Sequence, residues 1–136
     1  MNTLPSSKSD LEPYRKNEQI VRETAEQLIK DFALFGMNIS FTGNFTGAYN
    51  ELFEQAFEHI CKLIEKDYPR LLNLLYQIDI SESKIKKKLT ERPDLSLQEV
   101  ITHLILDREL LKVLTRTYFR DKARNGGIEK IEGREI

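Results

Sequence analysis

The chain has 136 residues and a formal net charge of −1; 32% of its residues are charged and 40% are hydrophobic. This balance is typical of one folded domain with a core of ordinary size, and it excludes a disordered chain. The strongly basic character of nucleic-acid-binding domains is missing, and no run of eighteen apolar residues occurs, so neither nucleic acid nor a membrane is an expected partner.

Residues 1–16 contain two prolines and scattered charges, and we expect them to form a flexible leader ahead of one helical domain over 17–122. The first predicted helix covers about 17–35, because apolar residues recur there in steps of three and four. Its apolar stripe consists of Val21, Ala25, Leu28, Phe32 and Phe35. Gly36 follows at a position where a left-handed residue commonly ends a helix.

Residues 36–47 carry no charge, and Met37, Ile39 and Phe41 alternate with polar residues in the period of two that is typical of an extended strand. Gly43-Asn44 is a candidate hairpin turn. Two interpretations remain open: a crossover that packs on the helices through its apolar residues, or a loop that contacts a ligand or partner. The candidate contact residues are Asn38, Ser40, Phe41, Asn44 and Phe45.

Three further helices are predicted in the middle of the chain. The first covers about 47–67, with apolar residues on one face and glutamates on the other. Pro69 suits the first turn of the next, over 70–78, which is apolar on all sides and should be largely buried. Ser81 is a good N-cap for a surface helix over 82–91.

The helix over 82–91 contains the basic cluster Lys84, Lys86, Lys87 and Lys88. Such a cluster is a candidate contact for nucleic acid or for an acidic partner. No aromatic residue lies among the lysines to stack on a base, so the alternative is an ordinary solvated helix face.

The last helix is predicted over 97–122, with a flexible tail over 123–136. Ser96 and Glu99 have the spacing of a capping box at its start. Besides its main apolar face, this helix has a second apolar stripe of Leu106, Leu110 and Val113. Two stripes indicate either a central helix that is flanked on both sides or a contact with another chain, such as a second copy in a homodimer.

Few residues are candidates for chemistry. His103 and Asp107 share a helix face at a spacing that can hold a metal ion, but further ligands would have to come from another helix, for instance His59. Neither histidine has the glutamate three residues earlier that carboxylate-bridged metal bundles use, so we predict no metal site, no cofactor and no catalytic residue. Cys61 is the single cysteine, and no signal-like apolar run lies near the N-terminus, which together favour the cytoplasm.

These patterns predict an all-α protein, a compact bundle of four or five helices with one irregular, extended crossover over about 36–47. The expected function is that of a helical protein-interaction or self-association module. Its expected partner is a protein, either a different one or a second copy of this chain in a homodimer. The alternative is a small-molecule-binding or enzymatic domain that uses residues 36–47. No motif in the chain is specific enough to indicate a family.

Overall fold

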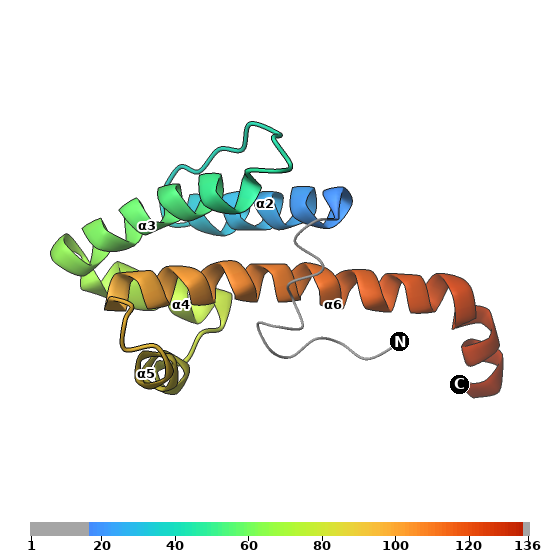
Figure 1. Cartoon of the computed structure of the whole chain (residues 1–136). Coiled ribbons are helices and arrows are strands. Elements are labelled where there is room, and N and C mark those ends of the chain that lie inside the picture. Colours follow the sequence, from blue (N-terminus) through green and yellow to red (C-terminus); the bar gives the residue numbers. More distant parts are fainter. Residues whose placement is uncertain (1–16, 135–136) are drawn as a thin grey trace.

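The computed structural model describes residues 17–134, with side chains described up to Ala123 (Figure 1). These residues form five helices and no strand, which confirms the predicted all-α bundle. The helices are α2 (Glu18–Ala33), α3 (Ala48–Lys66), α4 (Tyr68–Ile78), α5 (Glu82–Glu91) and α6 (Leu97–Arg134). The predicted leader, residues 1–16, lies outside the described residues.

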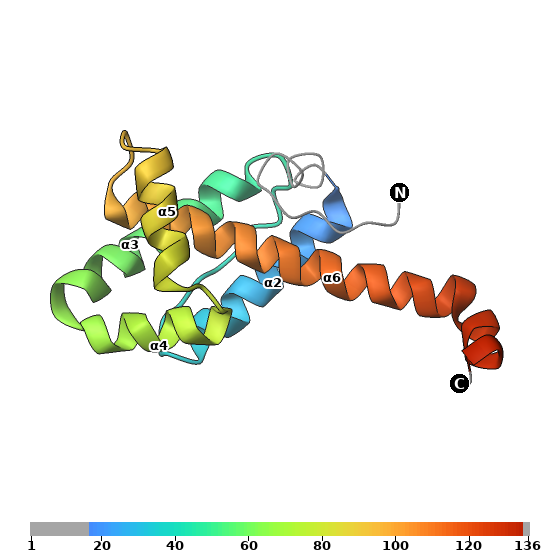
Figure 2. The ribbon, with the colours of Figure 1, turned by 90° about the horizontal axis from the view of Figure 1, so that it is seen from below.

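The last helix, α6, is the centre of the bundle. It contacts α2, α3, α4 and α5, and its C-terminal part extends past the other helices (Figures 1 and 2). Val100 and Ile105 of α6 are fully buried in the main core, together with Phe32 of α2 and Ile60 of α3. The stripe Leu106, Leu110 and Val113 is also buried, with 4%, 5% and 0% of its surface exposed. The structure therefore agrees with the first of the two predictions, a central helix that is flanked on both sides.

The predicted signals at the helix ends are confirmed. Ser96 N–H donates to Glu99 Oε1 at 2.8 Å, and Glu99 N–H donates to Ser96 Oγ at 3.1 Å, which completes the capping box of α6. The Ser81 hydroxyl accepts from Lys84 N–H at the start of α5. Gly36 has a φ of 75° just after α2, where a residue with a Cβ would be strained.

The predicted end of the last helix is wrong. We expected the helix to end at about residue 122, whereas the backbone of α6 stays helical to Arg134. The flexibility of residues 123–136 stays a prediction. No proline follows Pro93 to interrupt the hydrogen-bond ladder. The glycines at 126 and 127 each weaken a helix by only about 1 kcal/mol, so they do not end it.

The segment between α2 and α3 is extended, although it pairs with no strand in the described part of the chain. The side chain of Gln55 on α3 forms the main-chain hydrogen bonds that a neighbouring strand would form. Ser40 N–H donates to Gln55 Oε1 at 2.9 Å, and Gln55 Nε2 donates back to Ser40 O at 2.8 Å. Met37 and Ile39 are 7% and 3% exposed and belong to the main core, so the segment is a crossover that packs on the helices.

Two similar contacts flank the one made by Gln55. Thr42 N–H donates to Glu51 Oε2 at 2.8 Å, and His59 Nε2 donates to Asn38 O at 2.8 Å. Glu51, Gln55 and His59 follow one another at intervals of four residues, which span about 6 Å along a helix. Their partners in the extended segment follow one another at intervals of two residues, which span roughly 6.6 Å. The helix face and the extended segment therefore stay in register over three contacts.

Candidate interaction surface

The outer face of α4 carries a row of large exposed apolar side chains. Tyr68, Leu72 and Tyr76 are 50%, 42% and 88% exposed and lie four residues apart, so they share one side of the helix. We call this row the α4 ridge. Figure 2 shows α4 at the edge of the body, with no other described helix over its outer side. The prediction that this helix is largely buried is therefore wrong.

The opposite face of α4 explains why the helix binds the bundle in this orientation. Leu71, Leu74, Leu75 and Ile78 are all less than 7% exposed and belong to the main core. The buried face and the ridge are both apolar, while Arg70, Asn73 and Gln77 form a polar third side. Periodicity alone therefore does not indicate which of the two apolar faces is buried. The aliphatic residues fill the core, and the two tyrosines remain outside with their hydroxyl groups in water.

The ridge is free of charge. Within the eleven residues of α4, Arg70 is the only charged one. Its guanidinium is held by its own chain, because Nε lies 3.1 Å from Asp67 Oδ2 and Nη1 donates to Phe35 O at 3.1 Å. The other end of α4 is tied to α6 by Arg108, which donates to Ile78 O and forms an ion pair with Asp79 at 3.0 Å. These charges mark the two ends of the helix and leave its outer face apolar.

A shallow hollow lies beside the ridge. It has a volume of about 510 Å³ and is open to solvent. Leu34, at the end of α2, is 62% exposed and lines it. From α4 it is lined by Pro69, Arg70 and Asn73. Pro69 and Asn73 lie three residues before Leu72 and Tyr76 of the ridge, which makes them neighbours on the helix surface. The ridge and the hollow therefore form one continuous surface, which we call the α4 surface.

The stripe that sequence reasoning offered as a partner contact lies inside the chain. Leu110 and Val113 pack with Ile20 of α2 and Leu114 in a second core cluster, and Leu106 belongs to the main core. In this conformation none of the three predicted residues is available to another chain. Their burial explains the second stripe without a partner.

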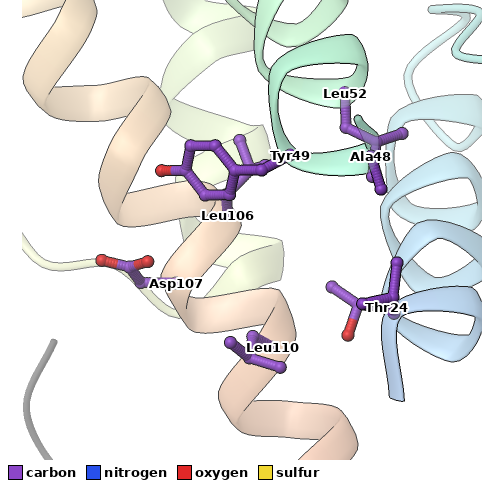
Figure 3. Close-up of a pocket in the computed structure, with 8 residues that line it drawn as sticks. Thr24, Ala48, Tyr49, Leu52, Leu106, Asp107 and Leu110 are labelled. Atoms are coloured by element: carbon purple, nitrogen blue, oxygen red, sulfur yellow. The ribbon is translucent and has the colours of Figure 1, made fainter. Parts of the chain in front are cut away.

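A small, partly open cavity lies where α2, α3 and α6 meet (Figure 3). Its volume is about 40 Å³, enough for about three or four water molecules at roughly 10–15 Å³ each, whereas small-molecule sites are usually several hundred Å³. The cavity is lined by Val21, Thr24, Ala48, Tyr49, Leu52, Leu106, Asp107 and Leu110. In the close-up the Tyr49 hydroxyl and the Asp107 carboxylate lie on the side away from Ala48 and Thr24, so the cavity wall is mainly apolar.

The histidines support the packing of neighbouring elements. His103 Nδ1 lies 2.7 Å from the Tyr49 hydroxyl, and its ring centroid is 4.6 Å from that of Phe53. His59 Nε2 donates a hydrogen bond to the main-chain carbonyl oxygen of Asn38 and so joins α3 to the crossover. Among the side chains that the structure describes, residues 17–123, no group of three His, Cys, Asp or Glu is arranged to hold a metal ion.

The predicted contact residues of the crossover mostly serve the fold. Besides the contacts of Asn38 and Ser40 with α3, Asn44 Oδ1 accepts from Gly47 N–H next to the start of α3. Phe41 packs against the main core, and Phe45 is half-buried. Neither phenylalanine lines the hollow beside α4 or the small cavity between α2, α3 and α6.

The basic cluster lies on α5. Lys84, Lys86 and Lys87 are exposed and Lys88 is half-buried, while Ile85 fixes the helix to the core. Lys84 and Lys88 are one step of four apart, so their like charges repel at close range. This geometry is that of a solvated helix face.

A charged cluster is buried between α2 and α6. Asp31 is 2% exposed and Glu109 is fully buried. Lys112 Nζ lies 2.8 Å from Asp31 Oδ2 and 3.1 Å from Glu109 Oε1. The second contact lacks hydrogen-bond geometry, so both Glu109 oxygens are buried without a hydrogen bond. Burial and the Asp31 carboxylate raise the pKa of Glu109 to about 8. The cluster is closed to solvent on the Glu109 side, so it stabilises an interface and does not serve as a substrate site.

Comparison of the chain with protein-family models, with curated proteins and with solved structures finds no match in any of the three. None of the helices within the described residues is long and apolar enough to cross a bilayer. The functional argument therefore depends on the surfaces of the chain itself.

Proposed function

We propose that the chain is a protein-interaction module that binds its partner through the α4 surface. The observation that carries this proposal is the α4 ridge, a charge-free row of two tyrosines and one leucine on the outside of a rigid helix. Three of the six large exposed apolar side chains of the described residues belong to it, and a fourth, Leu34, lines the adjoining hollow.

The composition of this surface supports a protein partner. Contact surfaces between proteins are enriched in tyrosine and poor in charge at their centre, and tyrosine is among the residues that contribute most to binding. The partner that suits the ridge is an apolar protein surface with few charges. The exposed face of α5 in the same chain, by contrast, is crowded with lysines.

The same surface argues against the enzymatic alternative. The small cavity between α2, α3 and α6 has room for only a few water molecules, and the hollow beside α4 is open and lined by a single cation that is already paired with Asp67. A binding site for a small molecule usually encloses most of its ligand. An apolar ridge next to an open hollow is better suited to another protein.

The proposal is tested by the size of the native complex in cells that express the protein. Because a weak complex dissociates on dilution, the cells are first treated with a chemical crosslinker. Size-exclusion chromatography of the lysate, with antibody detection, should then place a fraction of the wild-type chain above its monomer mass of 15.9 kDa. Leu72→Glu places a charge at the centre of the ridge and should return the chain to the monomer position. Asn50→Glu, an exposed change of equal charge on α3, is the matched control and should elute with the wild type.

Circular dichroism of the purified variants checks that each is folded. A wild-type chain that is a monomer in the lysate and also stays a monomer as pure protein at about 1 mM would contradict the proposal. So would a folded Leu72→Glu variant that stays in the same complex as the wild type.

A further inference from the structure

We propose that the partner at the α4 surface is a second copy of this chain, packed about a two-fold axis that passes beside Leu72. This inference rests on the proposed function and names the occupant of the same surface. It is carried by the symmetry of the ridge, by the position of the hollow beside it and by the lack of unpaired charge on both. The ridge is uncharged, and the two charged residues that line the hollow, Arg70 and Asp67, pair with each other.

The ridge has nearly the same sequence in both directions. Tyr68, Leu72 and Tyr76 read tyrosine, leucine, tyrosine from either end, at equal spacing. If two α4 helices lie antiparallel, a two-fold axis at Leu72 places the two leucines together. Each Tyr68 then lies near the partner's Tyr76. A two-fold interface must be complementary to itself, and this row meets that condition.

The hollow lies where such a dimer needs it. Leu34 lies beside the N-terminal half of α4, because Pro69 and Arg70 line the hollow with it and Arg70 donates to Phe35 O. The antiparallel arrangement brings the second copy's Tyr76 to this same half. Tyr76 is 88% exposed, so it is free to enter the open hollow beside Leu34. Each copy thus supplies one ridge and one hollow, as packing of ridges into grooves requires.

Charge does not oppose the contact. The chain has a net charge of −1, so two copies repel each other only weakly at long range. Arg70, the cation nearest the contact, keeps its own carboxylate partner at 3.1 Å. Two copies can therefore approach through this face without burying an unpaired charge.

The expected dimer is weak. Stable interfaces bury about 1,200–2,000 Å² in total, and one face of an eleven-residue helix, about 16 Å long, provides the low end of that range. We expect a monomer–dimer equilibrium with a dissociation constant on the order of 10–100 µM.

Sedimentation equilibrium of the purified full chain, from about 5 µM to 1 mM, measures this equilibrium directly. The wild type should change from 15.9 kDa toward twice that mass as concentration rises. Leu72→Glu should weaken association at least about tenfold, because it brings two like charges together at the axis. Asn50→Glu should associate like the wild type.

A charge pair tests the antiparallel geometry. Tyr76→Glu and Leu34→Lys should each remain monomeric at concentrations where the wild type dimerises. An equal mixture of the two should form a mixed dimer, since the new carboxylate of one copy then meets the new ammonium group of the other. Melting curves establish that both variants are folded, and both positions are exposed enough to accept the change.

Three results would overturn the inference. A wild type that stays monomeric to about 1 mM removes the second copy as partner. A dimer that Leu72→Glu leaves unchanged uses another face, and a mixture that forms no mixed dimer contradicts the antiparallel pairing. A monomeric pure protein that still joins a Leu72-dependent complex in lysate would leave the proposed function standing with a different partner, so the two proposals fail separately.

Discussion

Lys112 Nζ lies 2.8 Å from Asp31 Oδ2 and thereby joins the C-terminal part of α2 to the middle of α6. The carboxylate is 3% exposed, so the ion pair is shielded from water on the acidic side. Glu109, one turn before Lys112 on α6, completes the cluster. Burial raises the pKa of Asp31, but the carboxyl group of Glu109 beside it and the Lys112 ammonium group outweigh burial and hold that pKa below its ordinary value. Asp31 is therefore the ionised member and Glu109 the protonated member of the pair at neutral pH.

Glu109→Gln should change how stability depends on pH. Folded Glu109 keeps its proton up to about pH 8, whereas the ordinary pKa in the unfolded chain is 4.5. The folded state binds more protons in this range, so the free energy of unfolding of the wild type falls as pH rises through it. Glutamine has no such dependence, so the variant should gain a few kcal/mol relative to the wild type between about pH 5 and 8. Urea unfolding at a series of pH values measures the difference, and a constant difference would contradict the assignment.

Lys112→Met should destabilise the fold strongly. The substitution keeps an aliphatic side chain but leaves the buried Asp31 carboxylate without its cation, which costs about 3–5 kcal/mol. Lys30→Met, at an exposed position on α2, is the control and should change the free energy of unfolding by less than about 0.5 kcal/mol. Adding Asp31→Asn to Lys112→Met should recover much of the loss. If the single variant unfolds at the same urea concentration as the wild type, the ion pair does not join the two helices.

Gln55→Ala should loosen the crossover. It removes the two hydrogen bonds to the Ser40 main chain, each with a net value of about 1 kcal/mol at most in this exposed setting. Hydrogen exchange should show faster exchange of the Ser40 amide, while amides in the middle of α3 stay protected. Glu54→Ala, the exposed neighbour on the same helix, should leave Ser40 unaffected. Equal exchange in the two variants would refute the pairing of α3 with the extended segment.

Leucines on the two sides of α4 should respond differently to truncation. Leu74 is fully buried, so Leu74→Ala should cost about 2–5 kcal/mol through lost burial and a cavity. Leu72 is 42% exposed on the ridge, and Leu72→Ala should cost less than about 1 kcal/mol in the monomer. Chemical unfolding at low protein concentration measures both values. Similar losses would mean that α4 is rotated from the orientation described.

Much of the fold could be predicted because it depends on local signals. Helix ends follow from groups a few residues apart, such as Ser96 with Glu99, and these contacts are the same whatever the rest of the chain does. The alternation of Met37, Ile39 and Phe41 likewise indicated an extended crossover. The end of α6 was missed because helix continuation there depends on the absence of a strong breaker, for which periodicity gives no signal.

The candidate surface was harder to predict for a physical reason. Two neighbouring sides of α4 are apolar, and only the tertiary packing decides that Leu71 and Leu74 are buried while Leu72 and Tyr76 are exposed. The signal that was available is the tyrosine spacing of eight residues in a helix with one charge. The pairing of Asp31 with Lys112 spans 81 residues, so no local pattern could indicate it.

Photo-crosslinking from residue 76 tests the central claim most directly. A photoreactive phenylalanine derivative replaces Tyr76 on the ridge in one protein and exposed Lys87 on α5 in another, and both are illuminated in cells that express the protein. We predict a discrete adduct from position 76 that is much stronger than any from position 87 and that disappears when Leu72→Glu is added. Equal adduct formation from the two positions, or none from position 76, would contradict the assignment of the α4 surface as the contact with a protein partner.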